Sequence, residues 1–304
     1  MQRIYNYGSF LQAYALKKMM EECGAEVEFV DYHPGECILP SKETTGMKRK
    51  IQKGLEILRM KGRLRDKIQF VKYKKNYARK NYPVLGLKET YNYAPKLDLL
   101  VIGSDEVFNC IQDNSNVGFA PELFGAGHQA DRLVSYAASF GNTTLESLKK
   151  YQVDEQVAQW LRAFDAISVR DDNSRKIVQE LTGKDPVCHL DPVLVYDYPA
   201  NLPETKAKIP QDPYMILYGY SGRFNKEEAG EIRKYAKRKG LKILCIGGIQ
   251  SCGDKFIDCS PFEIFEYFKH AESVVTDTFH GTIFFRSHAE KICNFCEKER
   301  VWKF

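Results

Sequence analysis

The stretch Leu97-Asp98-Leu99-Leu100-Val101-Ile102-Gly103-Ser104-Asp105 is a short apolar run that ends at a glycine and two polar residues. An apolar run of this length is typical of a strand that is buried on both faces of a parallel sheet. Residues 133–138, 166–169 and 187–190 repeat the form, and a helical pattern with a capping aspartate covers 171–181. Strands that alternate with helices in this way predict an α/β fold with parallel sheets and crossover helices.

A proline-rich segment divides the chain into two such series. Residues 198–213 contain four prolines and few large apolar residues, and we interpret them as a linker between two lobes. The first lobe spans 1–197 and includes a basic helical insertion at about 46–82, and the second lobe spans 214–304. Further expected elements are helices over 9–23, 226–239, 261–271 and from near His280 onward, and strands over 27–32, 214–218, 242–246, 273–276 and 292–296.

The composition is that of a packed globular protein. The 304 residues are 43% hydrophobic and 12% aromatic, which excludes a disordered chain. There is no apolar run of about 18 residues, and the polar N-terminus lacks the apolar core of a secretion signal, so we expect a cytoplasmic protein. Nine scattered cysteines fit a reducing compartment. The close pair Cys293 and Cys296 lies in an expected strand without further ligands nearby, so we predict no metal site and no cofactor.

Positive charge is concentrated between Lys48 and Lys80. Fourteen Lys or Arg residues lie there, opposed only by Glu56 and Asp66. Apolar residues recur within this segment at helical spacing, which predicts two basic helices. Solvated helices that cover a site are one interpretation, and contact with an anionic membrane surface or an anionic substrate is the other. No nucleic-acid-binding motif accompanies the charge, so we do not expect nucleic acid as a partner.

Candidate site residues follow from the sheet rule that ligands bind beyond the carboxyl ends of parallel strands. The polar residues at those ends are Gly103-Ser104-Asp105, Ser135, Ser139-Phe140-Gly141, Arg170, Asp191-Pro192, Gly247-Gly248 and Asp277-Thr278-Phe279-His280-Gly281-Thr282, with Asn6-Tyr7-Gly8-Ser9 in the equivalent place after a missing first strand. The first of these segments also fits a turn and helix cap, and Asp191-Pro192 fits a structural turn. Neither a GxGxxG nor a GxxxxGK[ST] nucleotide-binding motif is present.

Two of these residues favour a functional interpretation. Arg170 directly follows an apolar strand, where a guanidinium is suited to bidentate binding of phosphate or carboxylate. The alternative is a salt bridge with Asp171 or Asp172. His280 follows a strand and precedes what resembles a helix start, where backbone N–H groups favour an anion and an imidazole exchanges a proton near pH 7.

Taken together, these segments resemble the polysaccharide pyruvyl transferase family. The matching pieces occur in family order and span nearly the whole chain. They are residues 6–16, 98–105, 135–141, 167–171, 190–194, Ser260-Pro261 and 274–282.

The resemblance implies two Rossmann-like lobes in a glycosyltransferase-B-like arrangement, with the ligand cleft between them. It also implies phosphoenolpyruvate as the donor and a sugar of a cell-surface glycan or exopolysaccharide as the acceptor, free or lipid-linked. By motif, the donor-binding arginine falls on Arg170 and the active-site histidine on His280. Removal of the sugar hydroxyl protons also needs a base, for which Asp105 and Asp277 are both candidates. The implied substrate-binding positions are Asn6, Gly8, Ser9, Gly103, Ser104, Ser139, Gly281 and Thr282.

The chain departs from the family pattern at both ends. Family members have a strand before the Asn6 segment and a further helical tail after Thr282, and we expect both to be missing here. Two alternatives to pyruvyl transfer therefore stay open. One is a nucleotide-sugar-dependent glycosyltransferase of the same architecture, and the other is a non-catalytic remnant that binds sugar or a partner protein.

Overall fold

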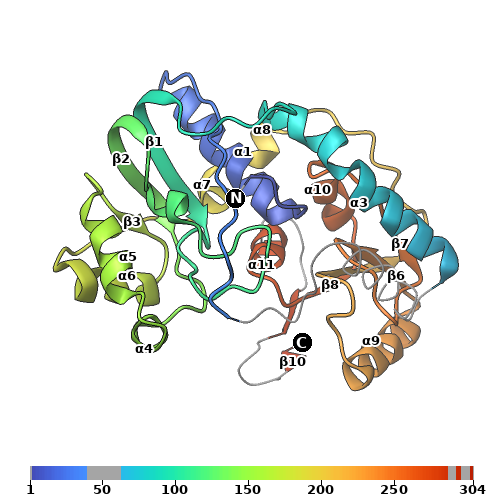
Figure 1. The fold of residues 1–304 in the computed structure, drawn as a ribbon. Coiled ribbons are helices and arrows are strands. Elements are labelled where there is room, and N and C mark those ends of the chain that lie inside the picture. The colour runs from blue at the N-terminus through green and yellow to red at the C-terminus, as the bar shows by residue number, and fades with distance from the viewer. Residues whose placement is uncertain (1, 40–62, 287–291, 296–301, 304) are drawn as a thin grey trace. The chain divides into compact units, whose positions relative to one another are not determined.

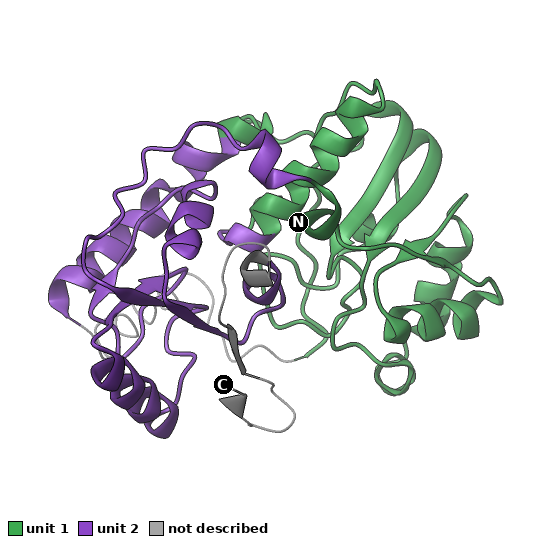
Figure 2. Ribbon diagram, turned by 180° about the vertical axis from the view of Figure 1, so that it is seen from behind, with its two compact units in different colours: residues 1–4, 9–44, 83–196 green, residues 5–8, 45–82, 197–304 purple. Residues whose placement is uncertain are grey.

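The computed structural model describes residues 2–39, 63–286, 292–295 and 302–303. Their contacts divide the chain into two compact units (Figures 1 and 2). Unit 1 comprises 1–4, 9–44 and 83–196, and unit 2 comprises 5–8, 45–82 and 197–304. Among the described residues, no helix is both long and apolar enough to cross a membrane.

Unit 1 is built on a parallel sheet in the order β1-β2-β3-β4. Its strands are β1 (Lys96–Asp105), β2 (Gln129–Ala138), β3 (Ser168–Val169) and β4 (Val187–Cys188). Its helices are α1 (Tyr7–Glu22, from Ser9 onward), the 3-10 helix η1 (Pro121–Phe124), α4 (Leu145–Lys150), α5 (Asp154–Arg162), α6 (Asp172–Thr182) and α7 (Pro192–Val195). The predicted α/β fold with parallel strands is confirmed, and the Asp171 side chain caps α6 as expected.

An aromatic core supports the carboxyl ends of these strands. The ring of Phe108, which follows β1, stacks on Phe124 at 4.9 Å between centroids and contacts Phe140 at 5.4 Å. All three are buried. Phe140 directly follows Ser139 at the end of β2, so burial of its ring fixes the backbone of the loop where the sequence places candidate residues.

Two expectations for unit 1 are wrong. Residues 27–32 do not form a strand, because their single pairing is an isolated bridge between Asp31 and Tyr93. The run that begins at Leu97 was expected to be buried on both faces, yet Leu99 is 42% exposed. Both expectations fail for the same physical reason. β1 lies at the edge of the sheet, and among the described strands β2 alone flanks it, so residues 27–32 do not join the sheet and the side chains of β1 are not fully covered.

Unit 2 is built on a second sheet in the order β10-β9-β8-β5-β6-β7. The strands are β5 (Tyr214–Tyr218), β6 (Lys242–Ile246), β7 (Lys255–Phe256), β8 (Ser273–Thr276), β9 (Ile292–Phe295) and β10 (Trp302–Lys303), and all neighbours are parallel except β9 and β10. The helices are α8 (Tyr198–Asn201), α9 (Lys226–Lys239), α10 (Glu263–Lys269) and α11 (Phe279–Arg286). The predictions for 214–218, 226–239, 242–246 and 273–276 are confirmed to the residue.

The basic segment contributes α3 (Leu64–Leu85), whose residues up to Tyr82 belong to unit 2. Its inner face is aromatic, and the ring of Phe70 meets that of Phe256 edge-on at 5.4 Å. The buried Asp66 carboxylate accepts a hydrogen bond from the Phe256 backbone N–H at 3.2 Å. The first of the two predicted basic helices lies outside the described residues.

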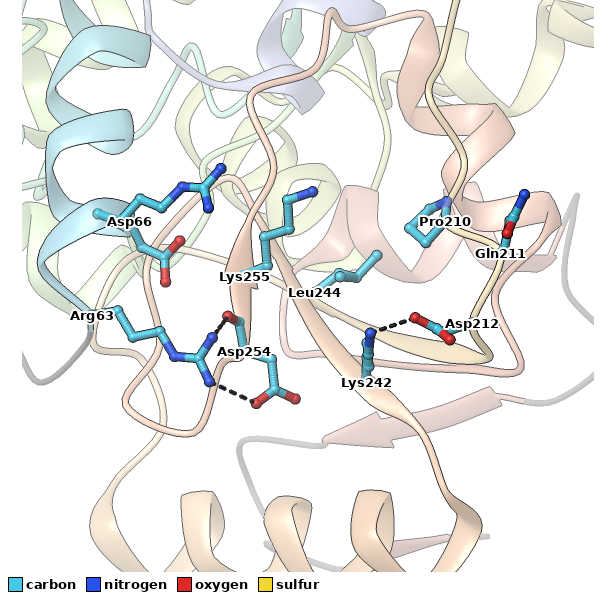
Figure 3. Close-up of a pocket in the computed structure, with 10 residues that line it drawn as sticks. Arg63, Asp66, Pro210, Gln211, Asp212, Lys242, Leu244, Asp254 and Lys255 are labelled. Carbon is cyan, nitrogen blue, oxygen red and sulfur yellow. Dashed lines mark hydrogen bonds and ion pairs between the residues drawn. The ribbon is translucent and has the colours of Figure 1, made fainter.

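A cavity of about 600 Å³ opens at the amino ends of β6 and β7 (Figure 3). Several of the charged side chains around it are paired. Arg63 donates to the backbone carbonyl of Asp254 at 3.0 Å, Arg233 donates to the Asp254 carboxylate at 2.7 Å, and Lys242 pairs with Asp212. The Asp254 carboxylate also accepts the Ile243 backbone N–H at 2.9 Å, so it joins the start of β6 to α9.

Asp254 makes the stability of unit 2 sensitive to acid. Burial alone would raise the pKa of Asp254, but Arg233 and the Ile243 N–H outweigh it and hold the pKa below its ordinary value. This stabilisation is complete above the ordinary Asp pKa of about 3.9 and is lost as the pH falls through the lower pKa of the folded state. We therefore expect Asp254→Asn to flatten the dependence of the unfolding midpoint on pH below 4. Asp212→Asn in the exposed pair is the control, and an equal flattening there would contradict the assignment.

Candidate active site

In unit 1, Arg170 lies between two aspartates. It follows β3 directly, and its guanidinium donates to Asp191 and, at 3.3 Å, to Asp105. The exposed fractions of the three side chains are 9% for Arg170, 0% for Asp191 and 13% for Asp105. Burial alone would lower the pKa of Arg170, but Asp105 and Asp191 raise it above its ordinary value, so the group is a fixed cation. The ion pair foreseen for Arg170 thus exists, with these acids in place of Asp171 or Asp172.

Hydrogen bonds join this group to α1 and β1. The Ser9 hydroxyl donates to Asp105 at 3.0 Å, and the Ser104 hydroxyl donates to Gln12 at 2.8 Å. Gly103 comes so close to β2 that a β-carbon on it would lie 2.0 Å from the Tyr136 carbonyl oxygen. Glycine is therefore required where β1 delivers Ser104 and Asp105 to the site.

Ser139 has a local role in unit 1. Its hydroxyl donates to Asp171 at 2.7 Å and accepts the Gly141 N–H at 3.0 Å. Because Asp171 also caps α6, these bonds hold the loop after β2 against the start of that helix. A substrate contact by Ser139 stays a prediction.

In unit 2, His280 lies in the first turn of α11, directly beyond β8. The side chain is buried and packs against the backbone of Gly8, where an added β-carbon would lie 2.5 Å from His280 Nδ1. The Asn6 side chain accepts the Gly8 N–H at 2.7 Å and donates to the Tyr220 hydroxyl at 2.6 Å. Asn6, Gly8 and His280 therefore form one cluster within unit 2, whereas the lobe boundaries expected from the sequence placed Asn6 and Gly8 in the first lobe and His280 in the second.

The turn into α11 explains the neighbouring positions. Gly281 donates its N–H to the Thr278 hydroxyl at 3.0 Å, and a β-carbon on it would lie 2.3 Å from the Thr276 hydroxyl oxygen. The Thr282 hydroxyl donates to the Thr278 carbonyl at 3.1 Å. These residues shape the turn that presents His280.

Arg223 was missed by the sequence analysis. Its guanidinium donates to Asp277, whose side chain is 10% exposed. Arg223 and Tyr220 both belong to the loop that follows β5, and applying the carboxyl-end rule to the strand over 214–218 would have found them. The Asp277 carboxylate is thus already engaged by a guanidinium in unit 2.

The family model of polysaccharide pyruvyl transferases matches residues 6–288. The chain belongs to the polysaccharide pyruvyl transferase family. It is thus a transferase, and the matched range includes every candidate site residue from Asn6 to Thr282. No curated protein matches the chain in sequence.

For a polysaccharide pyruvyl transferase, the candidate residues fall into two groups, and each group is described within its own unit. Asp105, Arg170 and Asp191 belong to unit 1, and Gly8 and His280 belong to unit 2. The joint action of Arg170 and His280 on one donor stays a prediction. Within the described residues, no group of three or more His, Cys, Asp or Glu side chains is arranged to hold a metal ion.

Gly8 permits a direct test of the His280 environment in this transferase. Gly8→Ala keeps a helix-compatible backbone and favours the helix by up to about 1 kcal/mol. Because the new methyl group occupies the place of the His280 ring, we expect turnover to fall at least tenfold while the unfolding midpoint changes little. The control is Gly230→Ala in α9, where no atom lies within 4 Å of the added β-carbon. Unchanged turnover in Gly8→Ala would show that the position of the ring is unimportant.

Proposed function

We propose that this chain transfers the pyruvyl group of phosphoenolpyruvate to a sugar of a cell-surface glycan or exopolysaccharide and forms a pyruvate ketal. The proposal includes two Rossmann-like lobes in a glycosyltransferase-B-like arrangement. The observation that carries it is the family match over 6–288, which spans Arg170 and His280. A buried, permanently charged guanidinium and a histidine at a helix start are the groups this donor requires.

The proposed reaction begins with proton transfer from His280 to the methylene carbon of phosphoenolpyruvate. Its C2 then becomes electrophilic, and a sugar hydroxyl oxygen bonds to it while the hydroxyl proton passes to a base. Phosphate leaves with the electrons of its bond to C2. A second hydroxyl of the sugar bonds to the same carbon and its proton returns to His280, while the proton held by the base passes to phosphate, so the products are the ketal and inorganic phosphate. Arg170 would bind the phosphate or the carboxylate throughout.

Asp105 is the better candidate for the base. Of the two aspartates that bind Arg170, Asp105 has the more exposed side chain and lies farther from the guanidinium, whereas Asp191 is fully buried. An anionic donor would compete with Asp105 for the guanidinium, since three anions around one cation repel one another. We propose that the donor displaces Asp105, which then accepts the hydroxyl proton, and that Asp191 keeps Arg170 in place. Asp277 is already bound by Arg223.

Ligand-dependent thermal stability tests the donor. Phosphoenolpyruvate should raise the unfolding midpoint in a dose-dependent way, because a ligand that binds the folded state stabilises it. UDP- and GDP-sugars should have no effect. The opposite pattern would sink the proposal in favour of a glycosyltransferase. No response to either class would favour the binding remnant.

We also propose that α3 contacts an anionic membrane at its inner, cytoplasmic face, where a lipid-linked acceptor would lie. The outward face of α3 exposes Leu64, Ile68 and Val71, followed along the same face by the exposed Lys72 and Lys75. Apolar and cationic side chains on one helix face are typical of interfacial helices. The helical spacing of these apolar residues was predicted from the sequence, but their exposure was not.

Vesicle sedimentation tests the membrane contact. The protein should bind vesicles that contain phosphatidylglycerol and not vesicles of phosphatidylcholine alone. Lys72→Glu/Lys75→Glu should weaken this binding at least tenfold. Lys237→Glu/Lys239→Glu on α9 makes the same change of charge at another exposed place in unit 2 and is the control. Equal loss in both variants would indicate a general charge effect and remove α3 from the proposal.

A further inference from the structure

A buried asparagine in the loop after β1 holds two exposed polar side chains of unit 1 beside each other. The Asn109 amide nitrogen donates one hydrogen bond to Glu106 Oε2 and the other to Asn142 Oδ1, both at 2.9 Å. The Asn109 carbonyl oxygen accepts the Thr143 hydroxyl at 2.9 Å and the Ile111 N–H at 3.2 Å. An asparagine side chain has two N–H donors and two acceptor positions, and here all four are used. The orientation of the Asn109 amide is therefore fixed.

This orientation decides which atoms of the two exposed side chains are left for a ligand. Because an N–H donor needs an acceptor, Asn142 turns its carbonyl oxygen toward Asn109 and its amide nitrogen away from it. Glu106 keeps one carboxylate oxygen on Asn109 and leaves Oε1 unused. Within the described residues, neither Glu106 Oε1 nor the Asn142 amide nitrogen makes a hydrogen bond, and both side chains are exposed. The surface of unit 1 thus presents a charged acceptor beside a neutral donor.

The acceptor and the donor lie at the carboxyl edge of the unit 1 sheet, where ligands of parallel sheets bind. Glu106 directly follows Asp105, which pairs with Arg170 at 3.3 Å. Burial would lower the pKa of Arg170, and Glu106 is among the acids whose charges raise it, after Asp105 and Asp191. Gly141 leaves room for this carboxylate, since an added β-carbon would lie 2.4 Å from Glu106 Oε2. The Glu106 carboxylate is therefore held in place near the residue to which donor binding is assigned.

We propose that Glu106 and Asn142 bind two neighbouring hydroxyl groups of the acceptor sugar. One hydroxyl donates to Glu106 Oε1, and the oxygen of the next accepts from the Asn142 amide. Each hydroxyl can both donate and accept, so a carboxylate beside an amide matches a sugar diol. The negative charge of Glu106 disfavours an acceptor that carries a carboxylate of its own, so the bound sugar is neutral. The inference rests on the proposed function, because only pyruvyl transfer makes this sugar the acceptor.

Saturation-transfer NMR on the full chain tests sugar binding without donor or turnover. The methyl glycosides of glucose, mannose and galactose are the probes, and we expect at least one of them to bind and methyl glucuronide not to bind. Glu106→Gln must keep its oxygen toward the Asn109 donor and so presents a second donor to the sugar, whereas Asn142→Ala removes the first. Each variant should raise the Kd of the hexoside about tenfold. Glu180→Gln, the same change of charge at an exposed position on α6, is the control and should leave the Kd unchanged.

Steady-state kinetics with phosphoenolpyruvate and the same hexosides separates this inference from the proposed function. Glu106→Gln and Asn142→Ala should raise the KM of the hexoside without weakening phosphoenolpyruvate binding. Hexoside binding that both variants weaken, without turnover in the natural protein, would support the sugar site and refute pyruvyl transfer. Turnover with a natural KM in both variants would refute the sugar site alone. Binding of none of the hexosides, or equal binding of methyl glucuronide, would also overturn it.

Discussion

His280→Ala is expected to abolish measurable pyruvyl transfer while phosphoenolpyruvate still binds. A positioned general acid contributes about 10²- to 10⁴-fold to a rate, and no other described histidine follows β8 or packs on the Gly8 backbone. Because donor binding is assigned to Arg170, loss of the imidazole should lower kcat far more than it raises the Kd of the donor. Steady-state turnover and calorimetric titration with phosphoenolpyruvate measure the two quantities separately.

Two further variants separate proton transfer from packing. His280→Gln fills much of the same space and hydrogen bonds but cannot donate a proton to carbon, so it should be as inactive as the alanine variant. His270→Ala removes an exposed imidazole in unit 2 whose Nδ1 contacts only the carbonyl and carboxylate of Glu266 among the described residues, and it should keep full activity. Substantial turnover in His280→Gln would show that the ring acts by shape, and the assignment of a general acid would fail.

The elements that the sequence predicted best are those whose signals are local. Helix α9 begins at a capping box formed by Asn225 and Glu228 and ends at Gly240 in the left-handed conformation, and each signal lies within a few residues of the boundary. The strand over 214–218 is buried throughout and lies between two partners. The apolar sequence of this strand therefore matches its fully buried position in the sheet.

The strand over 27–32 was predicted wrongly because strand formation depends on a partner elsewhere in the chain. Its alternating side chains suit a strand, yet the described structure gives it one bridge, at Asp31. Instead, Asp31 binds Arg3 at 2.5 Å and the Asn92 N–H at 3.0 Å. Non-local pairing of this kind leaves no mark within the segment itself.

The same distinction between local signals and contacts from distant segments applies to the candidate site. The carboxyl-end rule located Arg170 and His280, because it needs only the end of each strand. It did not identify Asp105 and Asp191 as the partners of Arg170, since they lie 65 and 21 residues away in sequence and are brought together by the sheet register. Two further contacts also join segments that are distant in sequence, namely the packing of His280 on Gly8 and the ion pair of Arg223 with Asp277.

Arg170→Ala is expected to be the most damaging single substitution in unit 1. It leaves the carboxylates of Asp105 and Asp191 buried without their cation, and removal of one partner of a buried ion pair costs about 3–5 kcal/mol. We expect a large fall in the free energy of unfolding of unit 1, measured by denaturant titration. Arg175→Ala, which breaks the exposed pair with Asp185, should have no measurable effect.

Loss of stability alone would also weaken ligand binding, so the two effects must be separated. Arg170→Met combined with Asp105→Asn and Asp191→Asn removes the cation and both buried charges together. Neutral side chains of similar size should recover most of the stability lost in Arg170→Ala, because replacing a buried ion cluster as a whole is often neutral. Phosphoenolpyruvate binding should not recover, since the guanidinium that would bind the donor is still absent.

Arg170→Lys completes the series. It retains a positive charge but loses the planar, bidentate geometry, so it should preserve more stability than alanine and still bind phosphoenolpyruvate at least tenfold more weakly than the natural protein. Across the three variants, the affinity for phosphoenolpyruvate would then depend on the guanidinium geometry. The free energy of unfolding would depend on the balance of charge around Asp105 and Asp191. If the stable triple variant bound phosphoenolpyruvate with natural affinity, Arg170 would be a structural residue and the donor would have to bind elsewhere.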